Sequence, residues 1–317
     1  PQGWPSECKL RAVPKDARGP RLIAPHSAAH MWMQQAVADR LCGILVRQEK
    51  WYKYHPLFDE NVSSIEFNDQ LVNAGVALWG STRPGCVGTM DLSDASDRIP
   101  WLLVETLVPP RLRRDLEAVR ARWILLPDGK REKLYMHAPM GSACCFPILS
   151  LVAWALTSAA IWLGTWAESG CCGLIPASID TVWVFGDDIA FSPNSWTLVA
   201  KMLPLTNLKV NENKSFFGPG GFRESCGMDA YQGDDVTPLR LRVDGVSSVS
   251  DLLTLVAHAN LLEQEGLPQT AKVCRDLIEI AADELGVRHL IGASTEWSYS
   301  STCIILPSDQ AKAWNRY

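Results

Sequence analysis

Residues 181–191, TVWVFGDDIAF, constrain the fold of this chain more than any other segment. Two apolar runs flank a Gly-Asp-Asp turn, which is the pattern of a β-hairpin. Gly186 lets the turn adopt a backbone conformation that a side chain would hinder. Asp187 and Asp188 then lie where two buried strands meet, and burying adjacent carboxylates is costly unless a cation compensates them. The segment therefore predicts a metal-binding hairpin.

A second Gly-Asp-Asp sequence serves as an internal comparison. Gly233, Asp234 and Asp235 lie in AYQGDDVTP, which lacks apolar runs on both sides. We interpret this copy as a structural turn.

A third acid, Asp91, ends the segment CVGTMDL, residues 86–92, which predicts a short strand. A strand end can place the Asp91 carboxylate beside the hairpin, although such a residue alone is more often a cap or a turn residue. Phosphoryl transfer to a 3′-hydroxyl uses two divalent ions about 4 Å apart, and Mg²⁺ takes only one or two carboxylates plus substrate phosphates. Asp91, Asp187 and Asp188 would suffice for two Mg²⁺ ions, or Mn²⁺ in their place.

Composition limits the class of protein. The chain has 317 residues, of which 47% are hydrophobic, and a formal net charge of −5, so it can bury a sizeable core and is no simple basic nucleic-acid coat. Basic residues gather in residues 1–21, with five Lys or Arg against two acids, and in residues 111–133, with eight against four. These segments fit either a charged channel or solvated faces.

Other segments predict helices. Residues 27–50 and 247–285 have apolar residues at helical spacing, and a loop with a helix follows residue 92. Residues 145–166 are apolar and long enough to cross a bilayer. Pro147 and several hydroxylated side chains favour a helix buried in the protein instead, and we expect that helix.

Six segments occur in an order that resembles the replicase catalytic subunit of the single-stranded RNA bacteriophages, the levivirus or Qbeta type. They are VPKDARGPRLIAP, TMDLSDASD, MGSACCFPILSL, VFGDDIAF, NENKSFF and GGFRESCGMDAYQGDDVTP. The chain departs from that family at Phe185, where a tyrosine is usual, and after MGS, at residues 143–145. It also lacks the family's long N-terminal region, so the resemblance implies a partial chain.

The resemblance implies an α+β fold, the right-hand polymerase. We expect partial fingers with a basic nucleotide-entrance motif in residues 1–85. Residues 86–240 would form the palm, an antiparallel sheet backed by helices with some finger insertions, and residues 241–317 a mostly helical thumb. The implied activity is RNA-directed RNA polymerase, copying phage RNA by two-metal-ion nucleotidyl transfer from ribonucleoside triphosphates.

The resemblance also implies roles for individual residues. Asp91, Asp187 and Asp188 would hold the metals, with Asp188 the less directly engaged of the hairpin pair. The incoming triphosphate would be bound by Lys15, Arg18 and Arg21, in a stretch that Pro14 and Pro20 keep extended or irregular. Lys214 would be the general acid for pyrophosphate, a role that requires surroundings that lower its pKa. Contacts to ribose or template would come from Ser96, Asp97, Ser142 and Asn211, with Asp94 as a helix cap.

The implied partners are template and product RNA, ribonucleoside triphosphates, host elongation factors Tu and Ts, and a ribosomal protein, in the cytoplasm of an infected bacterium and without a membrane. A reverse transcriptase shares the carboxylates and the metal chemistry, but Gly186 and the RESCG segment favour an RNA product. A non-catalytic RNA-binding remnant is a further alternative. It should have lost an acid or the basic motif, and both are present.

Overall fold

The computed structural model describes residues 7–16, 19–48, 70–168, 182–241, 243, 245–293 and 302–304. The chain divides into two compact units, residues 1–237 and residues 238–317. We describe each unit by itself.

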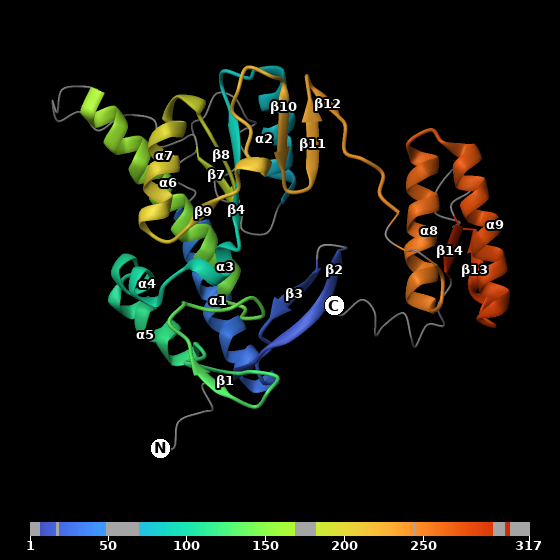
Figure 1. Cartoon of the computed structure of the whole chain (residues 1–317), viewed down its shortest axis with the longest axis horizontal. Coiled ribbons are helices and arrows are strands. Elements are labelled where there is room, and N and C mark those ends of the chain that lie inside the picture. Colours follow the sequence, from blue (N-terminus) through green and yellow to red (C-terminus); the bar gives the residue numbers. More distant parts are fainter. Residues whose placement is uncertain are drawn as a thin grey trace. The chain divides into compact units, whose positions relative to one another are not determined.

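A four-stranded antiparallel sheet forms the centre of the first unit (Figure 1). Its strands lie in the order β7 (Trp183–Phe185), β8 (Asp188–Phe191), β4 (Gly88–Ser93) and β9 (Lys209–Val210). The predicted hairpin and the predicted strand at residues 86–92 are therefore confirmed, and they are hydrogen-bonded neighbours.

Helices cover one face of this sheet. Met90 and Leu92 of β4 point into a core that α6 (Cys145–Glu168) and α7 (Trp196–Leu205) share, with Ile148 and Val199 among its buried side chains. The helix α1 (Ala28–Gln48), predicted at residues 27–50, contributes Leu41 to the same core. The short 3-10 turn η2 (Pro193–Ser195) precedes α7.

The apolar segment at residues 145–166 forms the helix that we predicted. Of the stretch Cys145–Gly164, which is long and apolar enough to cross a membrane, 56% is buried inside the protein. Ile148, Val152 and Ala160 are fully or almost fully buried, whereas Trp162 and Leu163 near the C-terminal end are exposed. The N-terminal part of α6 therefore works as a core helix.

The other face of the sheet packs against α2 (Gln70–Thr82), since Val76 of this helix is buried with Trp183 and Ala190. The helix also packs against a second antiparallel sheet of β10 (Phe222–Ser225), β11 (Met228–Tyr231) and β12 (Asp234–Asp235). Arg223 of β10 is buried, and its guanidinium donates to backbone carbonyls of Val87 and Pro84 ahead of β4. One side chain thus ties the second sheet to the start of β4.

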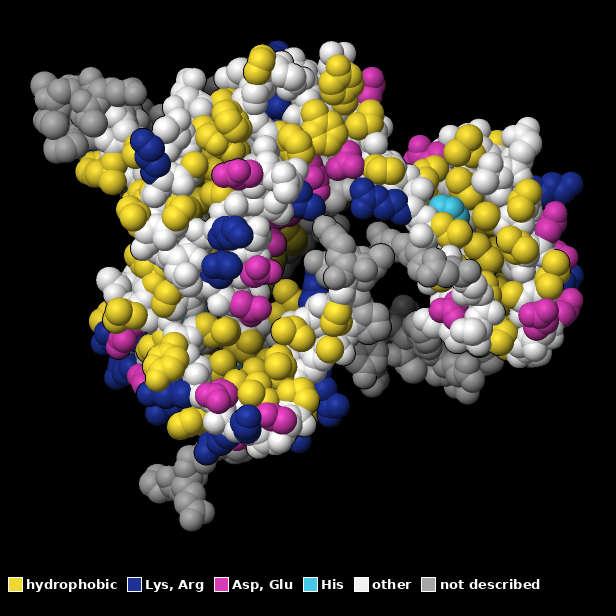
Figure 2. All heavy atoms as spheres, in the orientation of Figure 1, with side chains coloured by type: hydrophobic (Ala, Val, Ile, Leu, Met, Phe, Trp, Pro, Cys, Tyr) yellow, Lys and Arg dark blue, Asp and Glu magenta, His cyan; other side chains and the backbone are white. Residues whose placement is uncertain are grey.

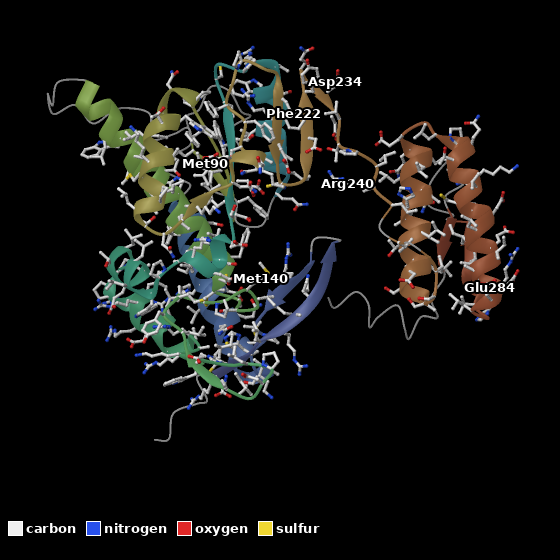
Figure 3. The ribbon with its side chains drawn as sticks, viewed as in Figure 1. Met90, Met140, Phe222, Asp234, Arg240 and Glu284 are labelled. Atoms are coloured by element: carbon white, nitrogen blue, oxygen red, sulfur yellow. The ribbon has the colours of Figure 1, made fainter. Side chains whose placement is uncertain are left out.

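In the second Gly-Asp-Asp sequence only Gly233 lies in the turn between β11 and β12, and the two acids form β12. Gly233 has a φ of +98°, and Asp234 and Asp235 are exposed on the edge strand. Figure 3 shows Asp234 at the outer edge of this second sheet, whereas Met90, which precedes Asp91, lies within the central sheet. The two copies therefore lie in different sheets.

The remaining elements of the first unit lie before and between the segments that form the central sheet. One sheet consists of β1 (Glu7–Lys9), β5 (Trp123–Leu125) and β6 (Arg131–Lys133). The strands β2 (Arg11–Asp16) and β3 (Gly19–Ile23), which come next after β1 in the chain, form a hairpin. The short helices are α3 (Ala95–Arg98), α4 (Trp101–Leu107), α5 (Pro110–Val119) and the 3-10 turn η3 (Glu212–Lys214).

Except for the buried Arg120, basic side chains of residues 111–133 lie on the surface of α5 and the β1–β5–β6 sheet, along the lower edge of this unit in Figure 2. Ion pairs join Arg113 to Glu105 and Arg131 to Glu7, the latter at 2.8 Å. Arg122 and Lys130 also pair with nearby acids. These pairs fit a solvated face, although the segment keeps an excess of positive charge.

The second unit is built on two packed helices, α8 (Val249–Gln264) and α9 (Pro268–Glu284), with the turn η4 (Arg288–Leu290) and a hairpin of β13 (Ile291–Ala293) and β14 (Thr302–Ile304). The predicted helical character of residues 247–285 is confirmed. Gly266, with a φ of +75°, and Pro268 divide the segment into two helices. Ser248 caps α8, because its hydroxyl accepts from the Asp251 backbone N–H.

Candidate active site

Three carboxylates come from the two central strands. The antiparallel register places Asp91 of β4 directly opposite Asp188 of β8. Asp187 lies in the turn just before Asp188, and its carbonyl accepts from the Leu92 backbone N–H at 3.2 Å. Since side chains alternate along a strand, Met90 and Leu92 enter the core while Asp91 faces the side of α2 and β10. Segments almost a hundred residues apart thus place their acids together.

Side chains of α6 hold the turn of the β7–β8 hairpin in place. Gly186 has a φ of +66°, and a Cβ at this position would lie 2.7 Å from the Phe146 ring. Its backbone N–H donates to the Ser150 hydroxyl at 2.9 Å. Phe146 also packs edge-to-face on Phe185, with ring centroids 4.7 Å apart. Phe185, where the family usually has a tyrosine, therefore keeps the aromatic contact.

The carboxylates carry more negative charge than their surroundings neutralise. Burial, followed by the charge of Asp187, raises the pKa of Asp188 to about 7. Burial also raises the pKa of Asp91 to about 6, although a hydrogen bond from Asn211 opposes the shift. A bound cation would stabilise the ionised forms of both groups.

The donor set fits a hard divalent cation. All three groups are carboxylates, which suit Mg²⁺ or Mn²⁺. Within the part of the chain that the structure describes, no three acidic, His or Cys side chains form a group that could hold one ion. This arrangement is not a closed metal cage, and it matches an ion that takes one or two carboxylates and completes its shell with water and phosphate.

Asp91 is held by the segment after β9. Asn211 donates from its amide Nδ2 to Asp91 Oδ2 at 2.6 Å, and its backbone N–H donates to the Asp91 carbonyl at 2.9 Å. Ser215 accepts from the Asp91 backbone N–H at 3.1 Å. The contact of Asn211 with ribose or template stays a prediction, and in this structure its amide is bonded to the Asp91 carboxylate.

Lys214 forms an ion pair with Glu224 of β10, with 2.8 Å between Nζ and Oε1. This hydrogen bond raises the pKa of Lys214, and the negative charges of Glu224, Asp91 and Asp188 act in the same direction. The condition that the surroundings lower the pKa of Lys214 is therefore not met in this structure. The cause is the local excess of carboxylates, and Glu224 in RESCG was the available signal.

Two contacts to Asp188 were not predicted. Asn73 of α2 donates from Nδ2 to the Asp188 carbonyl at 3.2 Å. Cys226, in the turn between β10 and β11, has a φ of +54°, and a hydrogen bond from its backbone opposes the rise in the pKa of Asp188. Asn73 carries no sequence signal, whereas Cys226 belongs to the RESCG segment.

The MGS loop joins the remaining candidates. Asp97 follows β4 in α3, burial raises its pKa, and its carboxylate accepts a hydrogen bond from the Met140 backbone. The Met140 carbonyl accepts from the Ala24 backbone N–H at 2.7 Å, just after β3. Ser96, which precedes Asp97, and Ser142, two residues after Met140, are both buried. The loop thus connects α3 to the end of the basic hairpin.

The basic stretch has the extended path that its prolines predicted, since it forms the hairpin β2–β3. Arg21 is exposed and lies opposite Val13. Arg18 and the side chain of Lys15 lie outside the described residues, so the convergence of the three cations stays a prediction. Asp94 occupies the N-cap position of α3 with a φ of 51°, but its side chain makes no capping hydrogen bond.

Comparisons with known proteins agree with this geometry. A family model described as "RNA replicase, beta-chain" matches residues 5–286. The chain is 32% identical over 248 residues to the RNA-directed RNA polymerase subunit beta of Qbeta virus (strain MX1), covering 78% of this chain and 37% of that protein. It is 29% identical over 255 residues to the RNA-directed RNA polymerase beta chain of Escherichia phage MS2, covering 80% and 41%. It thus spans about two fifths of these relatives.

Solved structures share the fold at low sequence identity. The BmCPV RNA-dependent RNA polymerase at its elongation state superposes with a TM-score of 0.52 at 12% identity, over 95% of this chain and 30% of that one. An insertion-loop deletion mutant of a human picobirnavirus RNA-dependent RNA polymerase gives 0.51 at 12% identity, over 89% and 59%. The mixed helix-and-sheet fold is that of viral RNA-dependent RNA polymerases.

Proposed function

The chain belongs to the RNA replicase beta-chain family, and from this premise we propose that it carries the catalytic core of an RNA-directed RNA polymerase. The reaction joins ribonucleoside triphosphates on a phage RNA template by two-metal-ion nucleotidyl transfer. The central and second sheets with their helices would be the palm of a right hand. Residues 1–85 would belong to partial fingers, and residues 241–317 to a mostly helical thumb.

One observation carries the proposal. Asp91 and Asp188 face each other across neighbouring strands, Asp187 adjoins them in the turn, and burial raises the pKa of two of the three acids. A structural role does not need this arrangement, because uncompensated carboxylates destabilise a fold. A divalent cation removes that cost.

Asp91, Asp187 and Asp188 would hold the two ions. Bound there, Mg²⁺ or Mn²⁺ would activate the attacking 3′-hydroxyl and neutralise charge on the leaving pyrophosphate. Asn211 and Ser215 orient Asp91, the first through its carboxylate and the second through its backbone. The pKa of Asp91 is kept lower by the Asn211 amide, which favours the ionised ligand.

Lys214 is our candidate proton donor to pyrophosphate. Its pKa is raised in this structure, so it holds its proton at neutral pH. Glu224 keeps the ammonium beside the carboxylates through the 2.8 Å ion pair. Proton transfer requires that phosphate oxygens replace Glu224 as its partner, because only then is the proton shared with the leaving group.

The basic hairpin β2–β3 would bind the triphosphate through Lys15, Arg18 and Arg21. Its connection to the site supports this role. The backbone N–H of Ala24, just after β3, donates to the Met140 carbonyl, and the Met140 backbone donates to the Asp97 carboxylate. Ser96, Asp97 and Ser142 would then contact the ribose or the template. By family resemblance, the complete replicase would work in the cytoplasm of an infected bacterium with elongation factors Tu and Ts and a ribosomal protein.

A primer-extension assay tests the proposal and its alternatives. The complete replicase carrying this segment should incorporate ribonucleotides on an RNA template only when Mg²⁺ or Mn²⁺ is present. A preference for deoxyribonucleotides would indicate a reverse transcriptase. RNA binding without incorporation, under conditions in which a phage replicase control is active, would indicate a non-catalytic remnant.

A further inference from the structure

The sheet of β1, β5 and β6 has one face packed on a core and one face turned outward. Cys8 and Ile124 lie on the packed side, where they join a buried cluster with Ala24 and Leu134. Side chains alternate along a strand, so the neighbours of Cys8 and Ile124 point to the other side. We call this side the open face. Its side chains form two rows across the strands, Glu7–Trp123–Lys133 and Lys9–Leu125–Arg131.

Two aromatic side chains belong to the open face. Tyr135 follows Lys133 by two residues, and the Lys133 Nζ lies over its ring at 5.2 Å from the centroid. Tyr135 is nevertheless 73% exposed. Trp123 is covered by the Arg131 guanidinium at 4.5 Å, which Glu7 holds through a 2.8 Å ion pair. The face thus presents an aromatic ring and a guanidinium held in place, and both groups can stack on nucleobases.

Cations outnumber acids on the open face. Lys9, Arg131 and Lys133 are exposed, and Glu7, the acid of the two rows, is already paired with Arg131. Among the residues that the structure describes, no ion pair involves Lys9 or Lys133. Phosphate groups would supply the anionic partners that these two lysines lack.

The combination of stacking groups and free cations fits a single strand of RNA better than a duplex. In a duplex the bases stack on one another, whereas a single strand can turn its bases onto side chains. Arg131 and Tyr135 are four residues apart in an extended stretch, roughly 13 Å along the chain. A sheet that stacks two or three bases of a single strand is an established mode of RNA recognition.

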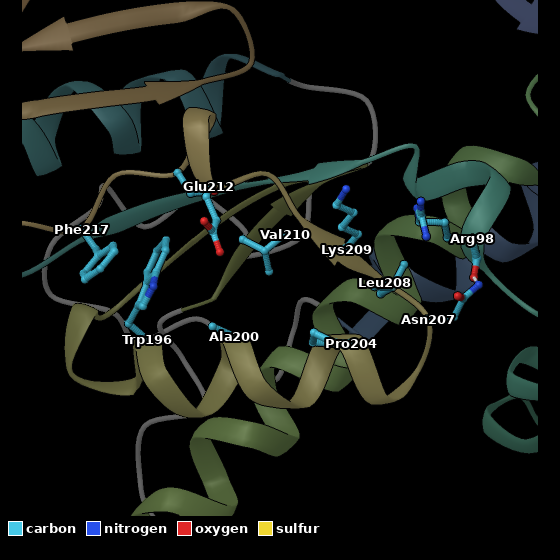
Figure 4. A pocket seen from close by; sticks show the side chains of 11 residues that line it. Arg98, Trp196, Ala200, Pro204, Asn207, Leu208, Lys209, Val210, Glu212 and Phe217 are labelled. Atoms are coloured by element: carbon cyan, nitrogen blue, oxygen red, sulfur yellow. Dashed lines mark hydrogen bonds between the residues drawn. The ribbon is translucent and has the colours of Figure 1, made fainter.

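The open face is distinct from the candidate active site. The β1–β5–β6 sheet lies at the end of the first unit opposite to β10, β11 and β12 (Figure 1), whereas Asp91 faces the side of α2 and β10. The face is also distinct from a pocket of about 660 Å³ beside α7, which Figure 4 shows with Trp196 and Lys209 in its wall. The described residues that line this pocket are all outside the β1–β5–β6 sheet.

We propose that the open face of the β1–β5–β6 sheet binds single-stranded RNA, with bases on Tyr135 and on the Arg131 guanidinium and phosphates on Lys9 and Lys133. The site is additional to the metal and substrate sites of a polymerase and does not rest on the proposed function. Stacking and phosphate contacts carry little sequence information, so the face binds RNA of different sequences.

Equilibrium binding without metal tests the stacking. A fluorescein-labelled 12-nucleotide oligouridylate would be titrated with the 317-residue chain in EDTA, and binding followed by anisotropy. Tyr135→Leu should weaken binding about fivefold or more, whereas Tyr135→Phe, which keeps the ring, should change the dissociation constant less than about twofold. Because Tyr135 is exposed, both variants should unfold at the Tm of the wild type.

The salt dependence tests the phosphate contacts. Lys9→Gln and Lys133→Gln should each reduce the slope of log K against log salt concentration by about 0.7, the value for one phosphate of a single strand. The matched control is Lys201→Gln, an exposed cation on α7, which should leave the slope unchanged.

Ultraviolet crosslinking of the same oligonucleotide, followed by mass spectrometry, locates the strand on the protein. The peptide that contains Tyr135 should carry RNA, and Tyr135→Leu should reduce this crosslink. Crosslinks confined to residues outside the open face would overturn the proposal.

Three binding results would also overturn it. Equal affinity for single-stranded and duplex RNA, or equal competition by a polyglutamate peptide, would show attraction by charge alone. Binding that Arg21→Ala abolishes and Tyr135→Leu leaves unchanged would place the strand on the basic hairpin. A chain without polymerase activity would still bind RNA at the open face, so failure of this test and failure of the proposed function are distinguishable.

Discussion

At the scale of single residues, Asp188 shows that burying a carboxylate in the candidate site lowers the folding stability of the metal-free protein. Its pKa rises from 3.8 to about 7 on folding, because burial and Asp187 disfavour the charged form. The folded state then binds the proton more tightly than the unfolded state does. Stability is therefore unaffected below pH 3.8, falls as the pH rises from 3.8 towards 7, and stays reduced above that range.

We expect Asp188→Asn to stabilise the metal-free protein at pH 8. After allowing for solvent screening, the gain should be on the order of 1–2 kcal/mol, smaller at pH 5 and absent near pH 3.5. Thermal unfolding in EDTA at the three pH values measures it. Mg²⁺ should raise the Tm of the wild type more than that of the variant. An equal gain at all three pH values would assign the effect to packing instead of charge.

The Asn211 amide has a separate effect that the pH profile can isolate. Because its hydrogen bond favours ionised Asp91, Asn211→Ala should raise the pKa of Asp91 above about 6. We expect the acidic limb of the kcat/KM profile to move to higher pH, with kcat reduced about tenfold. Asn213→Ala, an exposed change in the same turn η3, is the control. A uniform loss at every pH would contradict this role.

The sequence predicted which carboxylates meet, but not what holds them. Asp187 and Asp188 were separable from Asp234 and Asp235 because apolar strands flank only the first pair. The bond between Asn211 and Asp91 and the ion pair between Lys214 and Glu224 join segments far apart in the chain. Such contacts depend on strand register, which local patterns do not encode, and this is why the raised pKa of Lys214 could not be foreseen from the sequence.

At the scale of elements, the hairpin β7–β8 depends on Gly186 in two ways. A side chain would be strained at a φ of +66° and would also meet the Phe146 ring. Gly129 offers a matched comparison, because its φ is +84° and no atom lies within 4 Å of an added Cβ. We expect Gly129→Ala to cost about 1 kcal/mol of stability and Gly186→Ala clearly more, with loss of incorporation.

Chemical denaturation of both glycine variants measures the difference. Adding Phe146→Leu to Gly186→Ala should recover the steric part of the loss and leave the backbone strain. If Gly186→Ala costs no more than Gly129→Ala, Phe146 does not fix the turn, and the link between α6 and the hairpin is incorrect.

The hairpin β2–β3 can be tested through Arg21. We expect Arg21→Ala to raise the nucleotide KM several-fold and to lower incorporation, while affinity for template RNA changes little. Arg11→Ala, an exposed change on the neighbouring strand, is the control. A loss confined to template affinity, with normal nucleotide kinetics, would identify this hairpin as an RNA-binding surface.

Element prediction succeeded where a pattern is local. The apolar runs around Gly186 predicted β7 and β8, and helical spacing predicted α1, α8 and α9. Periodicity alone left two interpretations of α6, because a buried helix and a membrane span have the same composition. The packing of its N-terminal half behind the hairpin is a tertiary property.

At the scale of the whole molecule, the order of six segments indicated the family, and the family model and the fold agree with it. The chain spans only about two fifths of the length of these relatives. The division after residue 237 separates the candidate active site from the helical second unit. All residues that we propose for catalysis lie in the first unit.

The central claim is that Asp91, Asp187 and Asp188 form the polymerase site, and a pair of substitutions tests it most directly. Single-turnover incorporation would be measured for Asp187→Asn and Asp234→Asn in the complete replicase, at saturating Mg²⁺ and template. Each change removes one carboxylate charge at nearly constant shape from a Gly-Asp-Asp sequence. Asp187→Asn should abolish incorporation with the fold intact, whereas Asp234→Asn should retain it. Equal losses in the two variants, or full activity in Asp187→Asn, would contradict the account.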